Sequence, residues 1–138
     1  MRVELKNYEL VPALDFLSGM SVPANESRPI SKFKKLIVDA IEDLQEAQME
    51  IIERCGQKDE KGNVAIAEDG SGYILLPEKQ EEYTLETHNL LSEVVVFDGG
   101  THAKTIEKIS GILQEYTAEI SGKDAEIYDR LLDEFEKG

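Results

Sequence analysis

The sequence predicts an α+β fold that is mainly helical, with a long antiparallel helix pair, a terminal helix, a small β-sheet and a β-hairpin. Two heptad patterns indicate the helix pair. The apolar positions of the first are Ile30, Phe33, Ile37, Ala40, Leu44, Ala47 and Ile51. Those of the second are Ile106, Ile109, Leu113, Tyr116 and Ile120. Because such spacings place apolar side chains along one helix edge, we expect helices 29–55 and 101–121 to pack against each other.

A strand and a short helix are predicted at the N-terminus. Val3 and Leu5 alternate with charged residues, which is typical of a strand with one apolar face. The next helix carries three leucines on one face, Leu10, Leu14 and Leu17. Gly19 is a natural terminator for this helix. Its first residue stays open, because Pro12 can either occupy the first turn or disturb an earlier start.

The long helix follows a segment that contains prolines. Residues 21–29 predict a connection, with Pro29 in the first turn of the helix and Gly56 at its end. The helix has lysines near its start (Lys32, Lys34 and Lys35) and acids near its end, the reverse of what the helix dipole favours. We therefore expect compensating acids from the terminal helix to lie near the lysines. They form the predicted interaction surface, which consists of Asp129, Asp133, Glu134 and Glu136.

The middle of the chain predicts a β-hairpin and then a helix. Two extended runs, 64–67 and 73–76, flank residues 69–72, whose composition Asp-Gly-Ser-Gly supplies the conformations of a tight reversal. Pro77 can open the following helix, which runs to about Leu91. Glutamates near its start suit the helix dipole, and its apolar face is thin.

A second strand and two helices are predicted in the last third of the chain. Residues 94–97 form a β-branched run, so we expect a strand that is either buried on both faces or paired with the N-terminal strand. Thr101 is expected to cap helix 101–121, and Gly122 to break it. A terminal helix then begins at about residues 123–124. Its apolar stripe contains Ile127, Leu131 and Phe135, with Tyr128 and Leu132 beside it.

Length and composition favour one soluble domain. The 138 residues fit a single domain, 1–138, with the hairpin as an excursion at about 57–77. No run of eighteen apolar residues and no signal-peptide pattern occur, so we expect an unexported protein that does not bind membranes. Cys55 is the only cysteine, which excludes an intramolecular disulfide and suits a reducing cytoplasm. We interpret it as a small core or boundary residue.

The charge is strongly acidic. The net charge is −14, and residues 63–138 hold 6 basic and 17 acidic side chains, which is −11 of that total. Because this charge repels phosphate backbones, nucleic acid is not an expected partner. Two interpretations remain open: a well-solvated surface, or an acidic face that occupies a basic site on a partner, as in DNA mimics.

No motif indicates catalysis, a cofactor or a metal. His88 and His102 lie in different predicted elements, and a lone histidine is more often surface or cap structure than a ligand. Residues 59–69 lack the ligand order of a calcium loop. Residues 121–123 and 99–100 lack the spacing of phosphate and dinucleotide loops. We therefore expect no catalytic, cofactor-binding or metal-binding residues, and a protein that is not an enzyme.

The order of elements resembles a known family. The N-terminal strand Val3-Glu4-Leu5-Lys6-Asn7, the short leucine-rich helix, the long charged helix and the small hairpin are similar to an uncharacterised family of small proteins from tailed phages and prophages of Gram-positive bacteria. In that family, the segment similar to Glu53–Asn63 usually carries Tyr-Gly where Cys55-Gly56 stands here. The family supplies no catalytic residues or cofactor. The resemblance implies an accessory, assembly or virion-associated protein, located in the bacterial cytoplasm or the virion.

Two classes of function follow from these observations. The first is a structural or assembly protein that acts by protein-protein contacts. The second is an acidic inhibitor that binds a basic site on a host nucleic-acid enzyme. In either case we expect a protein partner. The long heptad pattern also predicts a homodimer that uses one face of a long helix, because identical heptads can pair with each other.

Overall fold

The computed structural model describes residues 2–98 and 100–137, and only the backbone of Thr101. The chain forms two compact units: unit 1 comprises Met1–Ile41 and Val94–Gly138, and unit 2 comprises Glu42–Glu93. Helix α2 (Ala24–Cys55) contributes its first part to unit 1 and its second part to unit 2. The predicted capping role of the Thr101 side chain lies outside the described residues.

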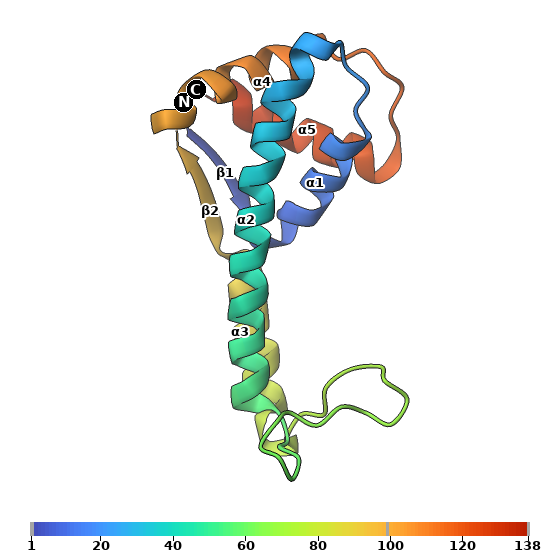
Figure 1. Cartoon of the computed structure of the whole chain (residues 1–138), viewed down its shortest axis with the longest axis vertical. Coiled ribbons are helices and arrows are strands. Elements are labelled where there is room, and N and C mark those ends of the chain that lie inside the picture. The colour runs from blue at the N-terminus through green and yellow to red at the C-terminus, as the bar shows by residue number, and fades with distance from the viewer. Residues whose placement is uncertain (1, 99, 138) are drawn as a thin grey trace. The chain divides into compact units, whose positions relative to one another are not determined.

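Unit 1 combines a small sheet with helices (Figure 1). In the described part of the chain, its strands are β1 (Arg2–Lys6) and β2 (Val94–Asp98), and its helices are α1 (Leu10–Gly19), the first part of α2, α4 (Ala103–Glu115) and α5 (Gly122–Glu136). Single 3-10 turns precede α1 and α4, at Asn7–Glu9 and Gly100–His102. With the helix of unit 2, these elements confirm the predicted α+β fold that is mainly helical.

The two strands pair antiparallel, with Val3 opposite Phe97. Both of these side chains face the core and are buried. Val94 and Val96 lie on the other face and are 50% and 42% exposed. The strand is therefore paired with the N-terminal strand, as one of the two predicted alternatives states. The other alternative, burial on both faces, is wrong because the outer face of β2 is open to solvent.

Phe33 lies at the centre of the unit 1 core. Its ring packs edge-to-face on Phe97 and Phe135, at centroid distances of 5.3 Å and 5.4 Å. Such aromatic pairs contribute about 0.5–1.5 kcal/mol each beyond the buried area. Because Phe33 belongs to α2, Phe97 to β2 and Phe135 to α5, these ring contacts join three elements. Helix α5 also packs on α1, α4 and β1. The predicted apolar stripe of the terminal helix is confirmed, with Ile127 and Leu131 buried beside Phe135.

Helix α1 begins at Leu10, so Pro12 lies in its first turn. At that position proline removes a backbone N–H that no carbonyl within the helix would accept. The helix ends at Gly19, as predicted. Its buried residues are Leu10, Ala13, Phe16 and Leu17, whereas Leu14 is only half-buried.

Helix α2 starts at Ala24, five residues before the predicted start. The carbonyl of Pro23 already accepts a hydrogen bond from the Glu26 amide, at 2.9 Å, which closes the first turn. Pro29 consequently lies inside the helix, where it removes one backbone hydrogen bond. The predicted connection before Pro29 is therefore wrong for residues 24–28, because burial of Pro29 and Ile30 stabilises the early turns despite that loss.

Helix α4 is shorter than predicted and ends at Glu115 rather than near residue 121. Tyr116 is extended, with φ −70° and ψ 122°, and its ring packs on Phe16 and Tyr128 at 6.1 Å and 6.4 Å. This aromatic cluster favours a turn over the continued heptad. Gly122, with φ +58°, begins α5 and so does not break a helix that continues through residue 121.

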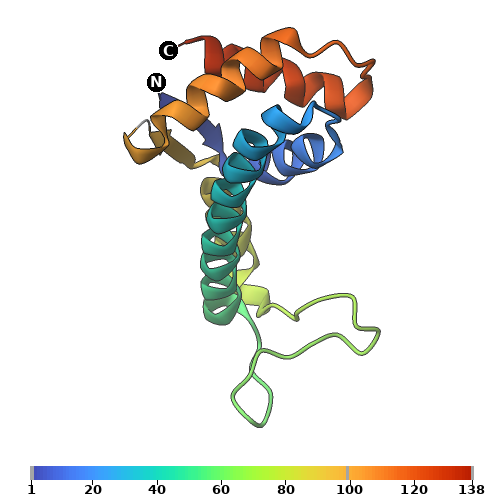
Figure 2. The same ribbon diagram turned by 45° about the horizontal axis from the view of Figure 1, so that its top comes forward.

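The long antiparallel pair of helices 29–55 and 101–121 does not form over that length. Figures 1 and 2 show α4 crossing the N-terminal turns of α2, where the core includes Ile30, Phe33 and Ile109. The heptad positions are nevertheless buried as predicted along the whole helix, apart from the half-buried alanines Ala40 and Ala47. The pattern therefore predicted the buried edge correctly but not the element that covers it.

Unit 2 contains the second part of α2, two chain reversals and helix α3 (Gln80–Ser92), which a 3-10 turn at Pro77–Lys79 precedes. Antiparallel bridges join Ile66 to Tyr73, which confirms the predicted hairpin, and Lys58 to Val64, which adds a second reversal. None of the side chains of α3 is buried, as the thin apolar face predicted.

Gly56 allows the reversals to pack against the end of α2. A Cβ atom at this position would lie 2.4 Å from Cγ1 of Val64 and 2.7 Å from the carbonyl oxygen of Ile52. Contacts this short do not occur between real side chains, so only glycine fits without a shift of its neighbours. Gly56, which was predicted to end the helix, thus also permits the segment around Val64 to approach the end of α2 closely.

Candidate protein-interaction surface

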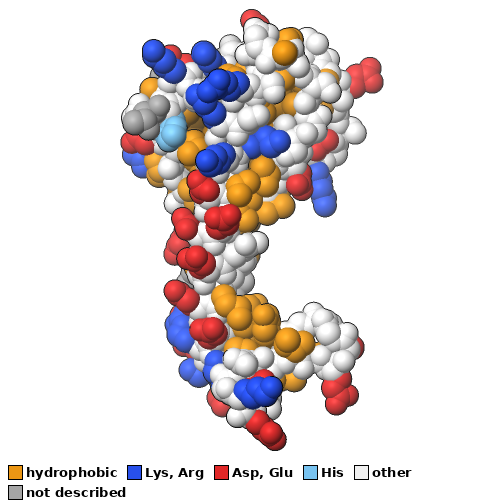
Figure 3. All heavy atoms as spheres, viewed as in Figure 1, with side chains coloured by type: hydrophobic (Ala, Val, Ile, Leu, Met, Phe, Trp, Pro, Cys, Tyr) orange, Lys and Arg blue, Asp and Glu red, His pale blue; other side chains and the backbone are white. Residues whose placement is uncertain are grey.

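The acidic charge is concentrated in unit 2. Residues 42–93 hold 4 basic and 14 acidic side chains, a net charge of −10, whereas the remaining 86 residues hold 11 and 15, a net charge of −4. Figure 3 shows acidic side chains along unit 2, with hydrophobic side chains beside them. The division of the acidic excess at residue 63, on which the sequence analysis relied, therefore does not match the structural units.

Exposed apolar side chains gather on the hairpin of unit 2. Ile66 is 62% exposed and Tyr73 is 43% exposed. Backbone hydrogen bonds flank this pair, from the Ala67 amide to Gly72 at 2.8 Å and from the Ile74 amide to Ala65 at 2.9 Å. The two residues are thus directly opposite in a position without mutual hydrogen bonds, where side chains approach most closely. We call Ile66 and Tyr73 the hairpin pair.

The turn that presents the hairpin pair is fixed by local bonds. The Asp69 carboxylate accepts a hydrogen bond from the Ser71 amide at 2.9 Å, and hydrogen bonding first to the side chain and then to the backbone of Ser71 lowers the pKa of Asp69. Gly70 has φ +73°, a backbone conformation that glycine adopts readily. Contacts within the turn itself therefore define its conformation.

A shallow hollow of about 430 Å³ lies beside the hairpin pair. Its lining mixes apolar side chains with one acid and one base, and includes Met49, Glu53, Lys58, Val64, Ile66 and Tyr73. An apolar surface rimmed by charged residues is typical of protein-binding sites. The arrangement is suited to contact with another protein.

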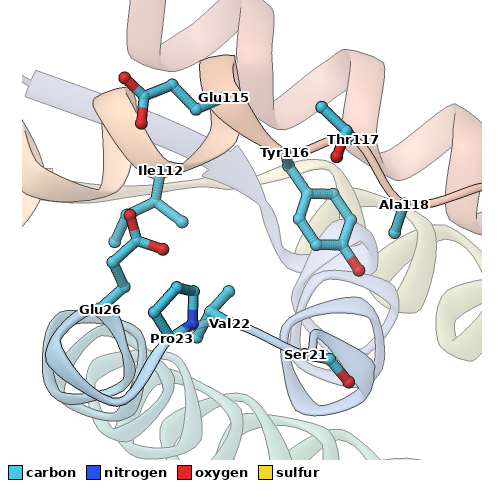
Figure 4. Close-up of a pocket in the computed structure, with 9 residues that line it drawn as sticks. All are labelled: Ser21, Val22, Pro23, Glu26, Ile112, Glu115, Tyr116, Thr117 and Ala118. Atoms are coloured by element: carbon cyan, nitrogen blue, oxygen red, sulfur yellow. The ribbon is translucent and has the colours of Figure 1, made fainter.

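A second hollow, of about 390 Å³, lies in unit 1 between the segment before α2 and the segment after α4. Figure 4 shows the carboxylates of Glu26 and Glu115 on one side and the Tyr116 ring on the other. Throughout residues 2–98 and 100–137, no three His, Cys, Asp or Glu side chains are grouped to hold a metal ion.

Glu134, one of the four predicted surface acids, is buried and belongs to an ionic cluster. Its carboxylate accepts hydrogen bonds from Arg130 Nη1 at 2.7 Å, from Lys137 Nζ at 3.0 Å and from the Glu4 amide at 3.0 Å. Arg130 also donates to Glu9 at 2.9 Å and to the Glu4 carbonyl at 3.0 Å. Glu134 is therefore not part of an exposed surface, because it binds the edge of β1.

The protonation of this cluster follows from its contacts. Burial by itself would raise the pKa of Glu134, but the hydrogen bonds from Arg130, Lys137 and the Glu4 amide outweigh burial and lower that pKa. Burial would likewise lower the pKa of Arg130, but Glu134 and Glu9 outweigh it and raise the pKa. Glu134 and Arg130 are consequently ionised at neutral pH, and their bonds to β1 make the cluster a structural clamp.

The other three predicted surface acids, Asp129, Asp133 and Glu136, are exposed on α5. Within the described residues, no ion pair joins any of the four to Lys32, Lys34 or Lys35, so the expected compensation of the lysines is not formed. The physical reason is that Arg130 and Lys137, on the same helix, are nearer partners for Glu134 than the lysines of α2.

His88, His102 and Cys55 belong to different elements of the fold. His88 is exposed on α3 in unit 2 and His102 is exposed before α4 in unit 1. Cys55 is fully buried, and burial, followed by Glu82, raises the pKa of its thiol. Its Sγ lies 3.6 Å from a Glu82 carboxylate oxygen. The interpretation of Cys55 as a core residue is confirmed.

Neither the hairpin pair nor the ionic cluster around Arg130 was predicted from the sequence, for different reasons. The alternation of polar and apolar residues around Asp69-Gly70-Ser71-Gly72 could have indicated which hairpin side chains share a face. No local pattern could have indicated that Arg130 meets Glu9, which lies 121 residues earlier in the chain.

The chain matches a protein-family model, whereas no curated protein and no solved structure matches it. Across the described residues, no helix combines the length and apolar character that crossing a membrane requires. A family model described as "Protein of unknown function (DUF1617)" matches residues 1–138, which is the whole chain. The chain therefore belongs to the DUF1617 family of proteins of unknown function.

Proposed function

We propose that this protein is a non-catalytic phage or prophage accessory protein that acts in structure or assembly through protein-protein contacts. The hairpin pair carries this proposal, because it places two large apolar side chains in solvent on an ordered turn. The resemblance of the sequence to a family from tailed phages and prophages supports the phage context. Cytoplasmic or virion-associated location belongs to the same proposal.

Affinity capture with a matched control tests the hairpin pair. Tagged wild-type protein, an Ile66→Ser/Tyr73→Ser variant and a Val11→Ser control are expressed in prophage-induced cells, and bound proteins are identified by mass spectrometry. Val11 is a suitable control because it is 49% exposed and lies in unit 1. We expect phage structural proteins to bind the wild type and the control, and to be lost from the double variant.

Two outcomes would oppose this proposal. Retention of the same phage proteins by the double variant would show that the hairpin pair is not the contact surface. Turnover of a substrate by the purified protein would contradict a non-catalytic role. We also expect the purified protein to bind neither duplex nor single-stranded nucleic acid, since unit 2 carries a net charge of −10, and to retain no stoichiometric metal.

The concentration of charge in unit 2 favours a second candidate function. In this alternative, the protein is an acidic inhibitor that occupies a basic, nucleic-acid-binding site on a host enzyme, as a DNA mimic does. The 14 acidic side chains of residues 42–93 would replace phosphates in that site. Capture of a host nuclease or polymerase, in place of phage structural proteins, would favour this function.

Salt distinguishes the two mechanisms for any partner that is captured. At 1 M salt the screening length falls to about 3 Å, so a complex held by charge dissociates. A complex held by the apolar hairpin pair persists, because burial of apolar surface does not depend on screening. Binding measured at low and at high salt therefore separates the assembly protein from the acidic inhibitor.

A further inference from the structure

The two edges of the β1–β2 sheet differ. The outer edge of β1 is closed by side chains: the Glu4 amide donates to Glu134 at 3.0 Å, the Glu4 carbonyl accepts from Arg130 at 3.0 Å, and the Lys6 amide donates to Glu9 at 2.8 Å. Three side chains thus take the place that a neighbouring strand would have. This edge cannot accept another strand while the ionic cluster is intact.

The geometry of β1 shows which backbone groups of β2 face outward. The backbone groups of Glu4 and the Lys6 amide point away from β2, because they bond to side chains on the far side of β1. In an antiparallel ladder, when the N–H and C=O groups of one residue point away from the partner strand, those of the residue opposite also point away from it. Val96 lies opposite Glu4, and Val94 lies opposite Lys6. Their N–H and C=O groups therefore face the open edge of β2.

The valine positions at the open edge of β2 lack the usual protection of an edge strand, and Asp98 is the one charged residue of the strand. Proteins commonly block such edges with charged side chains, proline or a bulge. Here the residues that flank the open backbone groups are Val94 and Val96, which are 50% and 42% exposed. In Figure 1, β1 runs along one side of β2 and the other long side of β2 faces outward. Within the described residues, no hydrogen bond to another element occupies the backbone groups of Val94 or Val96.

We infer that the outer edge of β2 pairs antiparallel with β2 of a second copy of this chain, centred on Val96, to form a four-stranded sheet. A two-fold axis through Val96 places Val96 opposite its copy and Val94 opposite Asp98 of the partner subunit. These positions are the ones whose backbone groups face outward, so the register uses the whole strand Val94–Asp98. A symmetric contact of this kind requires a self-complementary edge, which a central valine provides.

Charge supports a second copy as the occupant. On the outer face, Asp98 lies beside Arg2 within its own sheet, and the two-fold axis places Val94 of the partner subunit on its other side. No two acids face each other in this register, although the chain carries a net charge of −14. Pairing also enlarges a two-stranded sheet, which by itself is of marginal stability. This interface differs from the long-helix dimer that the heptad pattern predicts.

The size of the contact sets the expected affinity. A stable interface typically buries about 1,600 Å² in total, and one pair of five-residue strands supplies less than that. We therefore expect a reversible dimer that dissociates in the micromolar range. Sedimentation velocity over low to high micromolar concentration should show a shift from the chain mass of 15.5 kDa to twice that mass.

Substitution and cross-linking at Val96 test the interface. Val96→Lys places a charge at the two-fold axis and should keep the protein monomeric at concentrations where the wild type and a Val11→Lys control are dimeric. Val96→Cys should be joined into a covalent dimer by a short thiol cross-linker, whereas Val11→Cys and the wild type, whose Cys55 is buried, should not. Circular dichroism verifies that each variant is folded.

Several results would overturn the inference. A wild type that stays monomeric at high micromolar concentration excludes self-pairing, and so does a dimer that Val96→Lys leaves intact. If Val96→Lys does not fold, the cross-linking of Val96→Cys decides, and its failure in a dimeric sample excludes the two-fold register. Strand pairing that occurs only with a different protein also contradicts a second copy as the occupant.

Discussion

Units 1 and 2 differ in what they bury and in the charge they carry. Among the described residues, 21 hydrophobic side chains are buried, and 17 of them belong to unit 1. The four in unit 2 are Leu44, Ile51, Cys55 and Val64. Unit 2 nevertheless has a net charge of −10 in 52 residues. The buried apolar core is therefore concentrated in unit 1, and the acidic charge in unit 2.

Helix α2 shows this difference within one element. Its heptad pattern is continuous, but its first part is covered by the aromatic core around Phe33 and its second part by a helix without a buried side chain. The same heptad pattern thus packs into a large core in unit 1 and into a small core in unit 2. A small core tolerates self-repulsion poorly, so unit 2 should be the part that responds more to salt and to substitution of its packing contacts.

The largest effect on the free energy of unfolding should come from substitutions at two equivalent positions of the heptad pattern, Ile37 in unit 1 and Leu44 in unit 2. Ile37 is fully buried, and Leu44 is 8% exposed. Ile37→Asp should lower the free energy of unfolding by about 3–5 kcal/mol, because it buries an unpaired charge. Leu44→Asp should unfold unit 2 at a smaller cost, because its carboxylate lies nearer to solvent.

Thermal melting and amide hydrogen exchange measure this contrast. We expect loss of protection throughout the chain in Ile37→Asp, and mainly in residues 42–93 in Leu44→Asp. Wild-type melting temperatures for both variants would contradict the buried heptad edge. Equal loss of protection in both units for both variants would show that the two units unfold as one.

The next effect concerns the ionic cluster of unit 1. Glu134→Gln should lower the free energy of unfolding by about 1–3 kcal/mol at neutral pH, since it weakens the bonds to Arg130, Lys137 and the Glu4 amide. The folded state lowers the pKa of Glu134. Its stabilisation is therefore present above the unfolded value of about 4.3 and is lost as the pH falls through the folded value.

Denaturant unfolding from neutral to acidic pH measures this dependence as the difference between wild type and Glu134→Gln. That difference should shrink as the pH falls. The control is Glu136→Gln, because Glu136 is an exposed acid on the same helix. A difference that stays constant with pH would mean that the charge of Glu134 does not contribute to stability.

Two glycine substitutions, one in each unit, should have effects of opposite sign on stability. Gly56→Ala should destabilise unit 2 by about 1–3 kcal/mol, because the new Cβ would lie 2.4 Å from Val64. Gly111→Ala in α4 should stabilise unit 1 by about 0.5–1 kcal/mol, because its Cβ meets no atom within 4 Å and alanine favours the helix. Denaturant midpoints measure both. Equal and small shifts would show that the reversals move away from α2 at little cost.

The smallest effect should come from the hairpin pair. Ile66→Ser and Tyr73→Ser should each change the free energy of unfolding by about 0.5 kcal/mol or less, because both side chains are largely exposed. Leu85→Ser, at a position that is 62% exposed on α3, provides the control within the same unit. A large destabilisation by either hairpin substitution would assign the pair a packing role and weaken its assignment as a contact surface.

Several features of the fold could be predicted because they depend on neighbouring residues. The heptad positions of α2, the turn at Asp69–Gly72 and the stripe of α5 each follow from a local period or a turn composition. The ends of α2 and α4 could not be predicted in this way. Pro29 lies in a helix that core burial stabilises, and Tyr116 leaves the heptad to pack on Phe16.

Local patterns in the sequence are sufficient to predict the mainly helical α+β class, the buried edge of α2 and the hairpin, and composition gives the acidic excess. Tertiary structure alone decided that Glu134 is a buried clamp, since the Glu4 amide that it binds is 130 residues away. It also decided that the acidic excess belongs to unit 2 and that β2 keeps one open edge. The physical reason is that period and turn chemistry act over a few residues, whereas burial, ionic partners and strand edges depend on which distant segments meet.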